Sequence, residues 1–248
     1  VYKRQVLTCL AVAGIERHVI VGAEPDRMPF REGLAEIWGE RRARNFTLFV
    51  FLSMTAYFMQ ELILEPYAGL VFDFTPGEST ALSGAQNGGV FVGMLTVGIM
   101  VTGLGIGSLR AWVTAGCLGS AGALGLITLV GQMDIGLLVP AVVLLGIFNG
   151  MFAVAAIGAM MALAGQGRDA REGTRMGLWG AAQAIAAGFG GLLGAAAVDV
   201  MRQFVEAPAA FGAVFLFEAM LFFAAAMMAM RIVDATRRRP AHQIVPGE

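Results

Sequence analysis

Six long runs of apolar residues, almost free of charge, fill the chain between Phe46 and Met230. A helix needs roughly 20 apolar residues to cross ~30 Å of hydrocarbon, and these runs meet or approach that length. Because 57% of the residues are hydrophobic, a soluble fold of this length could not cover the apolar surface. The sequence therefore predicts an all-α membrane protein, a bundle of six transmembrane helices. The runs are 46–60, 88–109, 111–133, 135–166, 177–198 and 211–230, and the first is long enough only if it includes Glu61.

Basic residues are sorted along the chain by these runs. Of the 17 lysines and arginines, 14 lie before the first run or after the second, fourth and sixth, and only Arg202 lies on the other side. Lys3 and Arg4 are the remaining two. Short loops rich in Lys and Arg stay in the cytoplasm. We therefore expect a multi-pass protein with both flanks of the six-helix bundle in the cytoplasm.

The first 14 residues resemble the cut end of a longer segment. They begin with VYKRQ, which matches the translated end of a common transposon adapter, and continue with an apolar stretch too short to span a membrane. We interpret residues 1–14 as an adapter scar and the remnant of a preceding transmembrane helix. A true short amino terminus is the alternative.

Residues 15–44 are polar and rich in charge. Within them, Phe30, Leu34 and Ile37 recur at the spacing of one helical face. We expect a central cytoplasmic loop with an amphipathic helix that lies on the membrane surface or packs under the bundle. The domains predicted after this loop are the six-helix bundle at 45–230 and a cytoplasmic tail at 231–248.

Small residues recur at helical spacing within the runs. The pairs are Gly89/Gly93, Gly146/Gly150 and Gly190/Gly194, together with Gly180/Ala184/Gly188 and Gly116/Gly119/Gly122/Gly125. Small residues let transmembrane helices approach closely. We expect these faces to be packing seams, with a groove that admits a flat ligand as the alternative.

Polar side chains within the membrane indicate function, since each is unfavourable there unless it faces a partner or a cavity. At a rise of ~1.5 Å per residue, Glu61 lies roughly 22 Å from the start of the first run, and Glu218 lies about 10 Å below the outer surface. Six such side chains are expected in the outer half of the bundle. They are Gln60, Glu61, Glu65, Gln86, Asn87 and Glu218.

Glu61 and Glu65 are four residues apart and therefore share one helical face. Two carboxylates in a weakly solvated place do not easily both ionise, so we expect a shared or retained proton. Pro66 weakens the helix beside them and frees a carbonyl, before an apolar continuation from Tyr67. In the alternative interpretation the helix ends at Pro66 and both acids lie in interfacial water.

Asn149 and Gln183 form a second polar pair, predicted nearer the cytoplasmic side. A hydrogen bond between their helices is the simpler account of them, and a part in ligand binding is the other.

The sequence contains no set of residues typical of an enzyme. His18 and His242 are the only histidines and lie outside the runs, and there is no Ser/His/Asp set, phosphate-binding loop or metal-binding motif. We therefore expect no enzymatic activity and no resident metal. A tetrapyrrole metal held in the bundle would need Gln, Asn, Glu, a backbone carbonyl or water as its axial ligand.

The most distinctive segment is 59–72, MQELILEPYAGLVF, and three further segments accompany it: NGMFA from Asn149, GLWGAAQA from Gly177, and the helix of Glu218. Together they resemble the PucC/LhaA family, the bacteriochlorophyll-delivery branch of the major facilitator superfamily. The resemblance covers about 30–233. Many members have Asp at the position of Glu61 and Gly at that of Ala68, which leaves the polar geometry open.

This resemblance implies a twelve-helix transporter-like fold, of which the chain supplies the carboxy-terminal half and the central loop. It also implies that the protein handles bacteriochlorophyll for antenna polypeptides in the intracytoplasmic photosynthetic membrane, in contact with the enzymes of pigment synthesis. Some members have been labelled bacteriochlorophyll synthase subunits. The residues of this chain do not support a synthase reaction.

Three functions follow from these observations. The first is a bacteriochlorophyll carrier and assembly factor, the second a proton-coupled transporter of a small solute, and the third a pigment-free scaffold for antenna polypeptides. The candidate pigment- or proton-binding residues are Gln60, Glu61, Glu65, Pro66, Tyr67, Gln86, Asn87, Asn149, Gln183 and Glu218.

Overall fold

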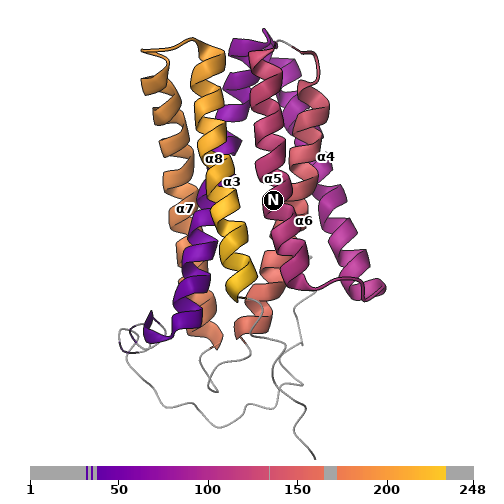
Figure 1. Ribbon diagram of the computed structural model, residues 1–248, viewed down its shortest axis with the longest axis vertical. Coiled ribbons are helices and arrows are strands. Elements are labelled where there is room, and N and C mark those ends of the chain that lie inside the picture. The colour runs from indigo at the N-terminus through magenta and orange to yellow at the C-terminus, as the bar shows by residue number, and fades with distance from the viewer. Residues whose placement is uncertain (1–31, 33–34, 36–37, 134, 165–171, 233–248) are drawn as a thin grey trace, which may run out of the picture.

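The computed structural model describes residues 32, 35, 38–133, 135–164 and 172–232. Within this part of the chain, six helices are long and apolar enough to cross a membrane, and there are no strands (Figure 1). They are α3 (Arg41–Val71), α4 (Pro76–Val97), α5 (Leu109–Gln132), α6 (Leu138–Ala164), α7 (Glu172–Met201) and α8 (Ala207–Ile232). The predicted all-α, multi-pass bundle of six helices is confirmed. The predictions for 1–14, for most of 15–44 and for nearly all of 231–248 lie outside the described residues.

Helix α3 continues through Pro66 to Val71. The proline removes one backbone donor, but Tyr67 and Ala68 beyond it are buried and hold the last turn against the bundle. The alternative that the helix ends at Pro66 is therefore wrong, and Glu61 and Glu65 both lie within the first spanning helix.

Helix α4 begins 12 residues before the predicted second run. Thr75 caps it, since its hydroxyl accepts from the Glu78 backbone N–H at 3.4 Å while the Glu78 carboxylate accepts from the Thr75 N–H at 2.8 Å. Pro76 occupies the first turn, where its missing donor does no harm. The helix ends in the π-helical turn η2 (Gly98–Gly103). Gln86 and Asn87 thus lie in the body of a helix.

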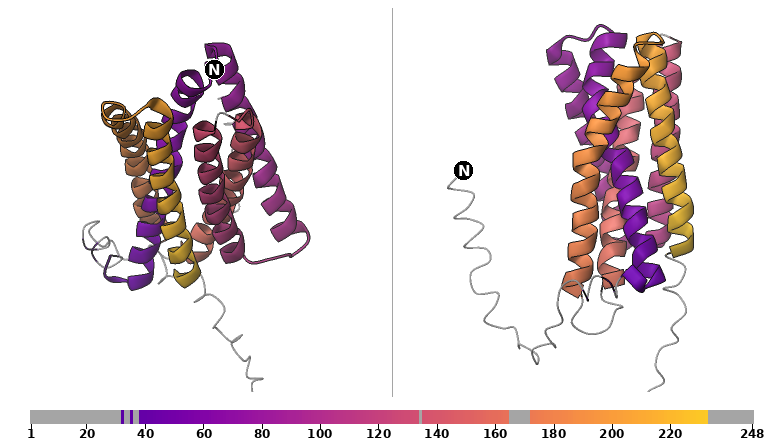
Figure 2. Two further views of the ribbon diagram at one scale, coloured as in Figure 1. Left: turned by 45° about the horizontal axis from the view of Figure 1, so that its top comes forward. Right: turned by 90° about the vertical axis from the view of Figure 1, so that its left-hand side faces the viewer.

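The helices are arranged in the spatial order α7, α3, α8, α5, α6, α4, each packed mainly on its neighbours in that order. Figures 1 and 2 show α7, α3 and α8 as one group and α5, α6 and α4 as another. If α3, α4 and α5 are exchanged for α6, α7 and α8 respectively, every closely packed pair of helices maps onto another closely packed pair. Because α3 and α6 start from opposite ends of the bundle, this is the pattern of an inverted repeat.

Glycines form the seam between α4 and α6, as predicted. A Cβ on Gly93 would lie 2.0 Å from the Ile147 carbonyl oxygen, and one on Gly150 would lie 2.0 Å from that of Val90. The helix backbones are therefore in direct contact, with no room for a flat ligand at this seam.

Of the other small-residue faces predicted as packing seams, some contact a neighbouring helix and others do not. Gly190 and Gly194 pack on α3, as expected. Gly116 and Gly119 pack on Phe152 and Phe148, whereas a Cβ added to Gly122, Gly125, Gly180 or Gly188 would meet no atom within 4 Å. A three-residue spacing drifts around a helix of 3.6 residues per turn, so the later glycines of α5 point away from α6.

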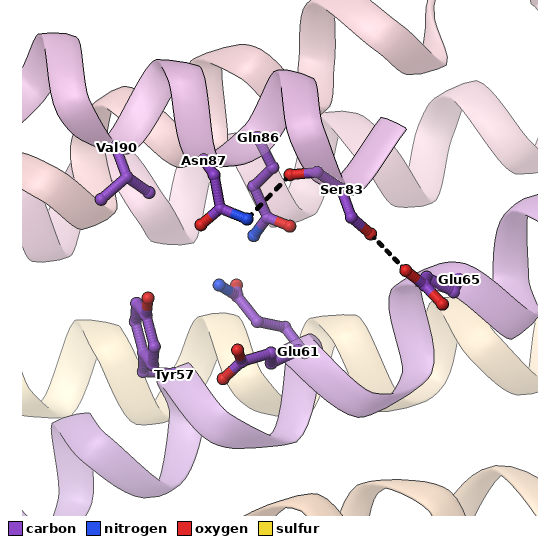
Figure 3. A pocket seen from close by; sticks show the side chains of 8 residues that line it. Tyr57, Glu61, Glu65, Ser83, Gln86, Asn87 and Val90 are labelled. Carbon is purple, nitrogen blue, oxygen red and sulfur yellow. Dashed lines mark hydrogen bonds between the residues drawn. The ribbon is translucent and has the colours of Figure 1, made fainter. Parts of the chain in front are cut away.

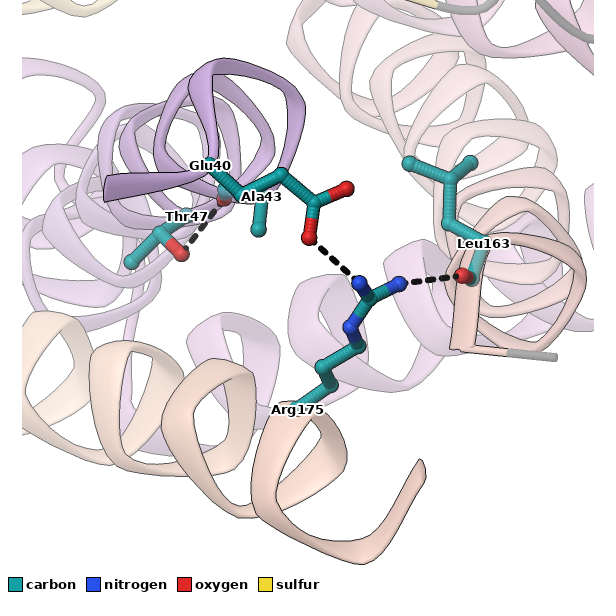
Figure 4. A network of polar contacts seen from close by, with 5 residues as sticks. All are labelled: Glu40, Ala43, Thr47, Leu163 and Arg175. Carbon is teal, nitrogen blue, oxygen red and sulfur yellow. Dashed lines mark hydrogen bonds and ion pairs between the residues drawn. The ribbon is translucent and has the colours of Figure 1, made fainter. Parts of the chain in front are cut away.

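The end of the bundle where α3 starts and α8 ends, here called the basic end, is held by Arg175 of α7 (Figure 4). Its guanidinium forms an ion pair with Glu40, just before α3, and donates to the Leu163 carbonyl of α6 at 3.2 Å. Arg175 is only 8% exposed. These contacts, the basic-end clasp, join three helices that are distant in sequence.

Candidate functional site

A pocket of about 150 Å³ lies between α3 and α4 (Figure 3). The two helices are consecutive but pack little on each other, because α4 is held by α6 and α3 by α7 and α8. This leaves space between them. The lining residues are Tyr57, Gln60, Glu61 and Glu65 of α3, and Ser83, Gln86, Asn87 and Val90 of α4.

The pocket brings together five of the predicted site residues. Glu61 and Glu65 occupy one face of α3, and Gln60 precedes them. Gln86 and Asn87 face them from α4 (Figure 3). The grouping follows from the helical spacing on α3 and from the antiparallel return of the chain into α4.

One hydrogen bond joins α3 and α4 at the end of the pocket away from the basic end. The Ser83 hydroxyl donates to Glu65 Oε1 at 2.7 Å, and Asn87 Nδ2 donates to the Ser83 carbonyl at 3.0 Å. Figure 3 shows Ser83 reaching towards Glu65 across the two helices. One carboxylate oxygen of Glu65 is thus already used, while no hydrogen bond engages Glu61 among the described residues.

Gln60 is the most unusual residue of the pocket. It is 0% exposed, and neither its amide oxygen nor its amide nitrogen has a hydrogen-bond partner among the described residues. Buried polar atoms are nearly always paired, and each unpaired one is unfavourable by about 1–3 kcal/mol. Both atoms are therefore available to a partner that enters the pocket.

The pocket is rich in acceptor oxygens, and its three side-chain amides also carry N–H donors. Two carboxylates and three side-chain amides line it, and none of the described lining residues is Lys, Arg or His. Among the residues that the structure describes, no group of three His, Cys, Asp or Glu could hold a free metal ion. The site suits a ligand group that donates hydrogen bonds, or a metal already held by its own ring that needs one axial oxygen.

Pro66 and Tyr67 do not line this pocket. Pro66 is exposed on α3, and Tyr67 is buried, with its hydroxyl donating to the Ile127 carbonyl at 2.9 Å. The Tyr67 ring packs against Phe211 and Phe215 of α8. Tyr67 therefore joins α3, α5 and α8 in the core.

Asn149 forms an interhelical hydrogen bond, but not with Gln183. Its Oδ1 accepts from the Ser120 hydroxyl of α5 at 2.8 Å, and its Nδ2 has no partner among the described residues. The pairing with Gln183 is wrong because α6 packs on α4 and α5 and meets α7 only slightly.

Glu218 lies in α8, apart from the pocket lining. It is 0% exposed, and neither carboxyl oxygen has a partner among the described residues. It shares a helical face with Phe211, Phe215 and Phe222, which pack into the core. A charge there would be unfavourable by several kcal/mol, so this site suits an uncharged carboxyl group.

Three pocket residues escaped the sequence analysis, namely Tyr57, Ser83 and Val90. Tyr57 lies four residues before Glu61, and Ser83 lies four before Asn87, so helical spacing alone would have placed them beside the predicted residues. Ser83 was missed because it lies five residues before the second predicted run, whereas Gln86 and Asn87 directly precede its start at Gly88.

Comparison with known proteins identifies one family of similar proteins. The family model described as PUCC protein matches residues 2–237. A Rhodobacter capsulatus protein named bacteriochlorophyll synthase 44.5 kDa chain is 63% identical over 98% of this chain and 57% of its own length. Protein PucC of Rhodobacter capsulatus is 30% identical over 82% of this chain and 45% of its own length. Protein PucC of Cereibacter sphaeroides is 27% identical over 74% of this chain and 39% of its own length. The chain spans about half the length of these curated relatives.

These comparisons correct one prediction. We expected no enzymatic activity, because the sequence lacks the usual catalytic sets. The relative at 63% identity carries the name of a bacteriochlorophyll synthase chain, which contradicts that expectation. The absence of catalytic motifs was a weak basis for that expectation, since a chain that serves an enzyme assembly need not hold the catalytic residues itself.

Proposed function

The chain belongs to the PucC family, and we propose that it handles bacteriochlorophyll during the assembly of light-harvesting complexes. In this proposal the pocket between α3 and α4 holds a polar edge or the central metal of the pigment ring. Its partners are the antenna polypeptides and the enzymes that make the pigment. It acts in the photosynthetic inner membrane, with the basic end in the cytoplasm.

The unpartnered amide of Gln60 is the observation that carries this proposal. A ring-bound magnesium prefers oxygen ligands, and both the Gln60 amide oxygen and the free Glu61 carboxylate face the pocket. The pocket, about 150 Å³, is smaller than a complete pigment site of ≈ 300–1,000 Å³. The rest of the ring and its apolar tail therefore lie outside, against α4 and lipid.

The outer face of α4 suits an apolar tail. Phe91, Val92 and Leu95 are exposed there, about one to two helical turns from the pocket residue Asn87. Because the relatives are about twice as long as this chain, we further propose that the bundle is one half of a major-facilitator-type fold. The inverted-repeat pattern of the helix packing supports this proposal.

The test replaces Glu65 by Ala in the full-length protein, expressed in a phototrophic host that lacks its own copy. We expect the protein to remain in the membrane while antenna absorption falls, because the variant loses both the carboxylate and the Glu65–Ser83 bond. The matched control is Glu206→Ala, which removes an exposed acid before α8, outside the pocket. Normal antenna absorption in the Glu65→Ala membranes would refute the proposal.

A proton-coupled transporter is the second candidate. It is favoured by the two carboxylates one turn apart in one pocket and by the buried, unpartnered carboxyl of Glu218. Proton-dependent uptake of a small solute into proteoliposomes of the full-length protein would support it. Purification in mild detergent followed by an absorption spectrum separates the pigment carrier from a pigment-free scaffold.

A further inference from the structure

A second, smaller pocket lies at the basic end of the bundle, where α3, α6 and α7 meet. Its volume is about 30 Å³, the space of one oxygen-sized group. The lining residues are Glu40, Arg42, Ala43, Leu163, Arg175 and Trp179. It therefore lies beside the basic-end clasp, far along the helices from the pocket of Gln60.

Two residues that line this pocket each carry a buried donor with no acceptor among the described residues. The two terminal nitrogens of Arg175 bind Glu40 and the Leu163 carbonyl, but its Nε has no partner among the described residues. The indole Nε1 of Trp179 also has none. The two residues are 8% and 0% exposed, so water outside the protein does not serve these donors. Two such donors on residues of one small pocket could both be satisfied by a single acceptor oxygen.

The charge around the pocket favours an anionic oxygen. Arg42, exposed at the rim, adds a second guanidinium, while the carboxylate of Glu40 is already paired with Arg175. Two arginines and one glutamate leave a net charge of +1 on the lining. Thr47 does not compete for the ligand, since its hydroxyl donates to the Ala43 carbonyl at 2.8 Å (Figure 4).

The position of the pocket along the spanning helices indicates where that oxygen comes from. Arg42 lies in the first turn of α3, at the end of the spanning helices, where lipid phosphates lie. Basic pockets between transmembrane helices bind the head groups of anionic lipids. We propose that this pocket binds a phosphate oxygen of an anionic phospholipid, which accepts from Arg175 Nε and Trp179 Nε1 while Arg42 contacts the outer phosphate oxygens. The lipid would tie α3 to α7 at the clasp, independently of any pigment.

The test uses the full-length protein in nanodiscs of phosphatidylcholine, with or without phosphatidylglycerol. Native mass spectrometry counts the bound lipids, and an apparent Tm reports their effect on stability. We expect bound phosphatidylglycerol and a higher Tm. Trp179→Phe keeps a ring beside Phe46 but removes the indole donor, and Arg42→Ala removes the rim charge. Each should weaken the preference for phosphatidylglycerol about tenfold, the value of one hydrogen bond to a charged group.

The control is Arg231→Ala, which removes an exposed arginine in the last turn of α8, at the same end but outside the pocket. It should leave the lipid preference unchanged. Equal binding of the two lipids, which a pocket filled by water alone predicts, would overturn the proposal. So would an unchanged preference in both pocket variants. If inorganic phosphate in pure phosphatidylcholine raises the Tm as much as phosphatidylglycerol does, the site binds a free anion and the lipid assignment is wrong.

Discussion

Replacing Gly93 by Ala tests whether the α4–α6 seam determines the position of the pocket wall. A Cβ at Gly93 would lie 2.0 Å from the Ile147 carbonyl oxygen and 2.9 Å from the Met151 backbone nitrogen. Both are backbone atoms, so no change of side-chain rotamer relieves the clash. A real Cβ needs at least 3.0 Å, and α4 must therefore move from α6 by at least 1.0 Å, the difference between 3.0 and 2.0 Å.

The magnitude follows from this overlap. Overpacking of a tight interface lowers stability by about 1–3 kcal/mol. At about 2–4 °C per kcal/mol for a chain of this size, the apparent Tm should fall by about 2–12 °C. Because α4 carries Ser83, Gln86 and Asn87, the same movement displaces one wall of the pocket, and the pigment recovered with the purified protein should also fall.

Gly88→Ala is the matched control, on the same helix and with the same added methyl group. No atom lies within 4 Å of a Cβ at Gly88, so the substitution meets open space. The apparent Tm of both variants is measured in mild detergent by heating followed by size-exclusion chromatography. If Gly93→Ala and Gly88→Ala unfold at the same temperature, the close approach of the two helices is not a determinant of stability.

Two further predictions concern buried polar groups. Gln60→Leu removes the unpartnered amide, so we expect the pigment-free protein to be at least as stable as the wild type while bound pigment is lost, as measured by Tm and absorption. A Tm loss with pigment retained would show that the amide is structural. Tyr67→Phe removes the bond to the Ile127 carbonyl and should lower stability by about 1 kcal/mol, with antenna absorption unchanged. A loss of antenna absorption in stable Tyr67→Phe would place Tyr67 in the functional site.

Apolar length and helical spacing were sufficient to predict that six spans exist, and the candidate residues included five of the eight that line the pocket. Glu61 and Glu65 are one turn apart on a helix whose course is fixed by its apolar residues, so their shared face followed from the sequence. The glycines of α4 and α6 likewise indicated a seam.

The predictions that were wrong or missing mostly depend on which helices are neighbours in the bundle. Asn149 was paired with Gln183 because both lie at similar depth, but its partner Ser120 lies on a helix that sequence spacing does not identify. The start of α4 was missed because a capping box of Thr75 and Glu78 is polar and does not resemble a spanning segment. The missing partner of Gln60 is visible only once the surrounding atoms are placed.

The spatial order of the helices makes the bundle two packed triplets, α7–α3–α8 and α5–α6–α4, joined mainly where α5 meets α8. The walls of the Gln60 pocket come from different triplets, since α3 belongs to one and α4 to the other. A small rotation about the α5–α8 contact would widen or narrow this pocket while the packing inside each triplet stays intact. If the pocket binds pigment as proposed, a rigid-body movement of the triplets would be enough to release it, without side-chain rearrangement inside either triplet.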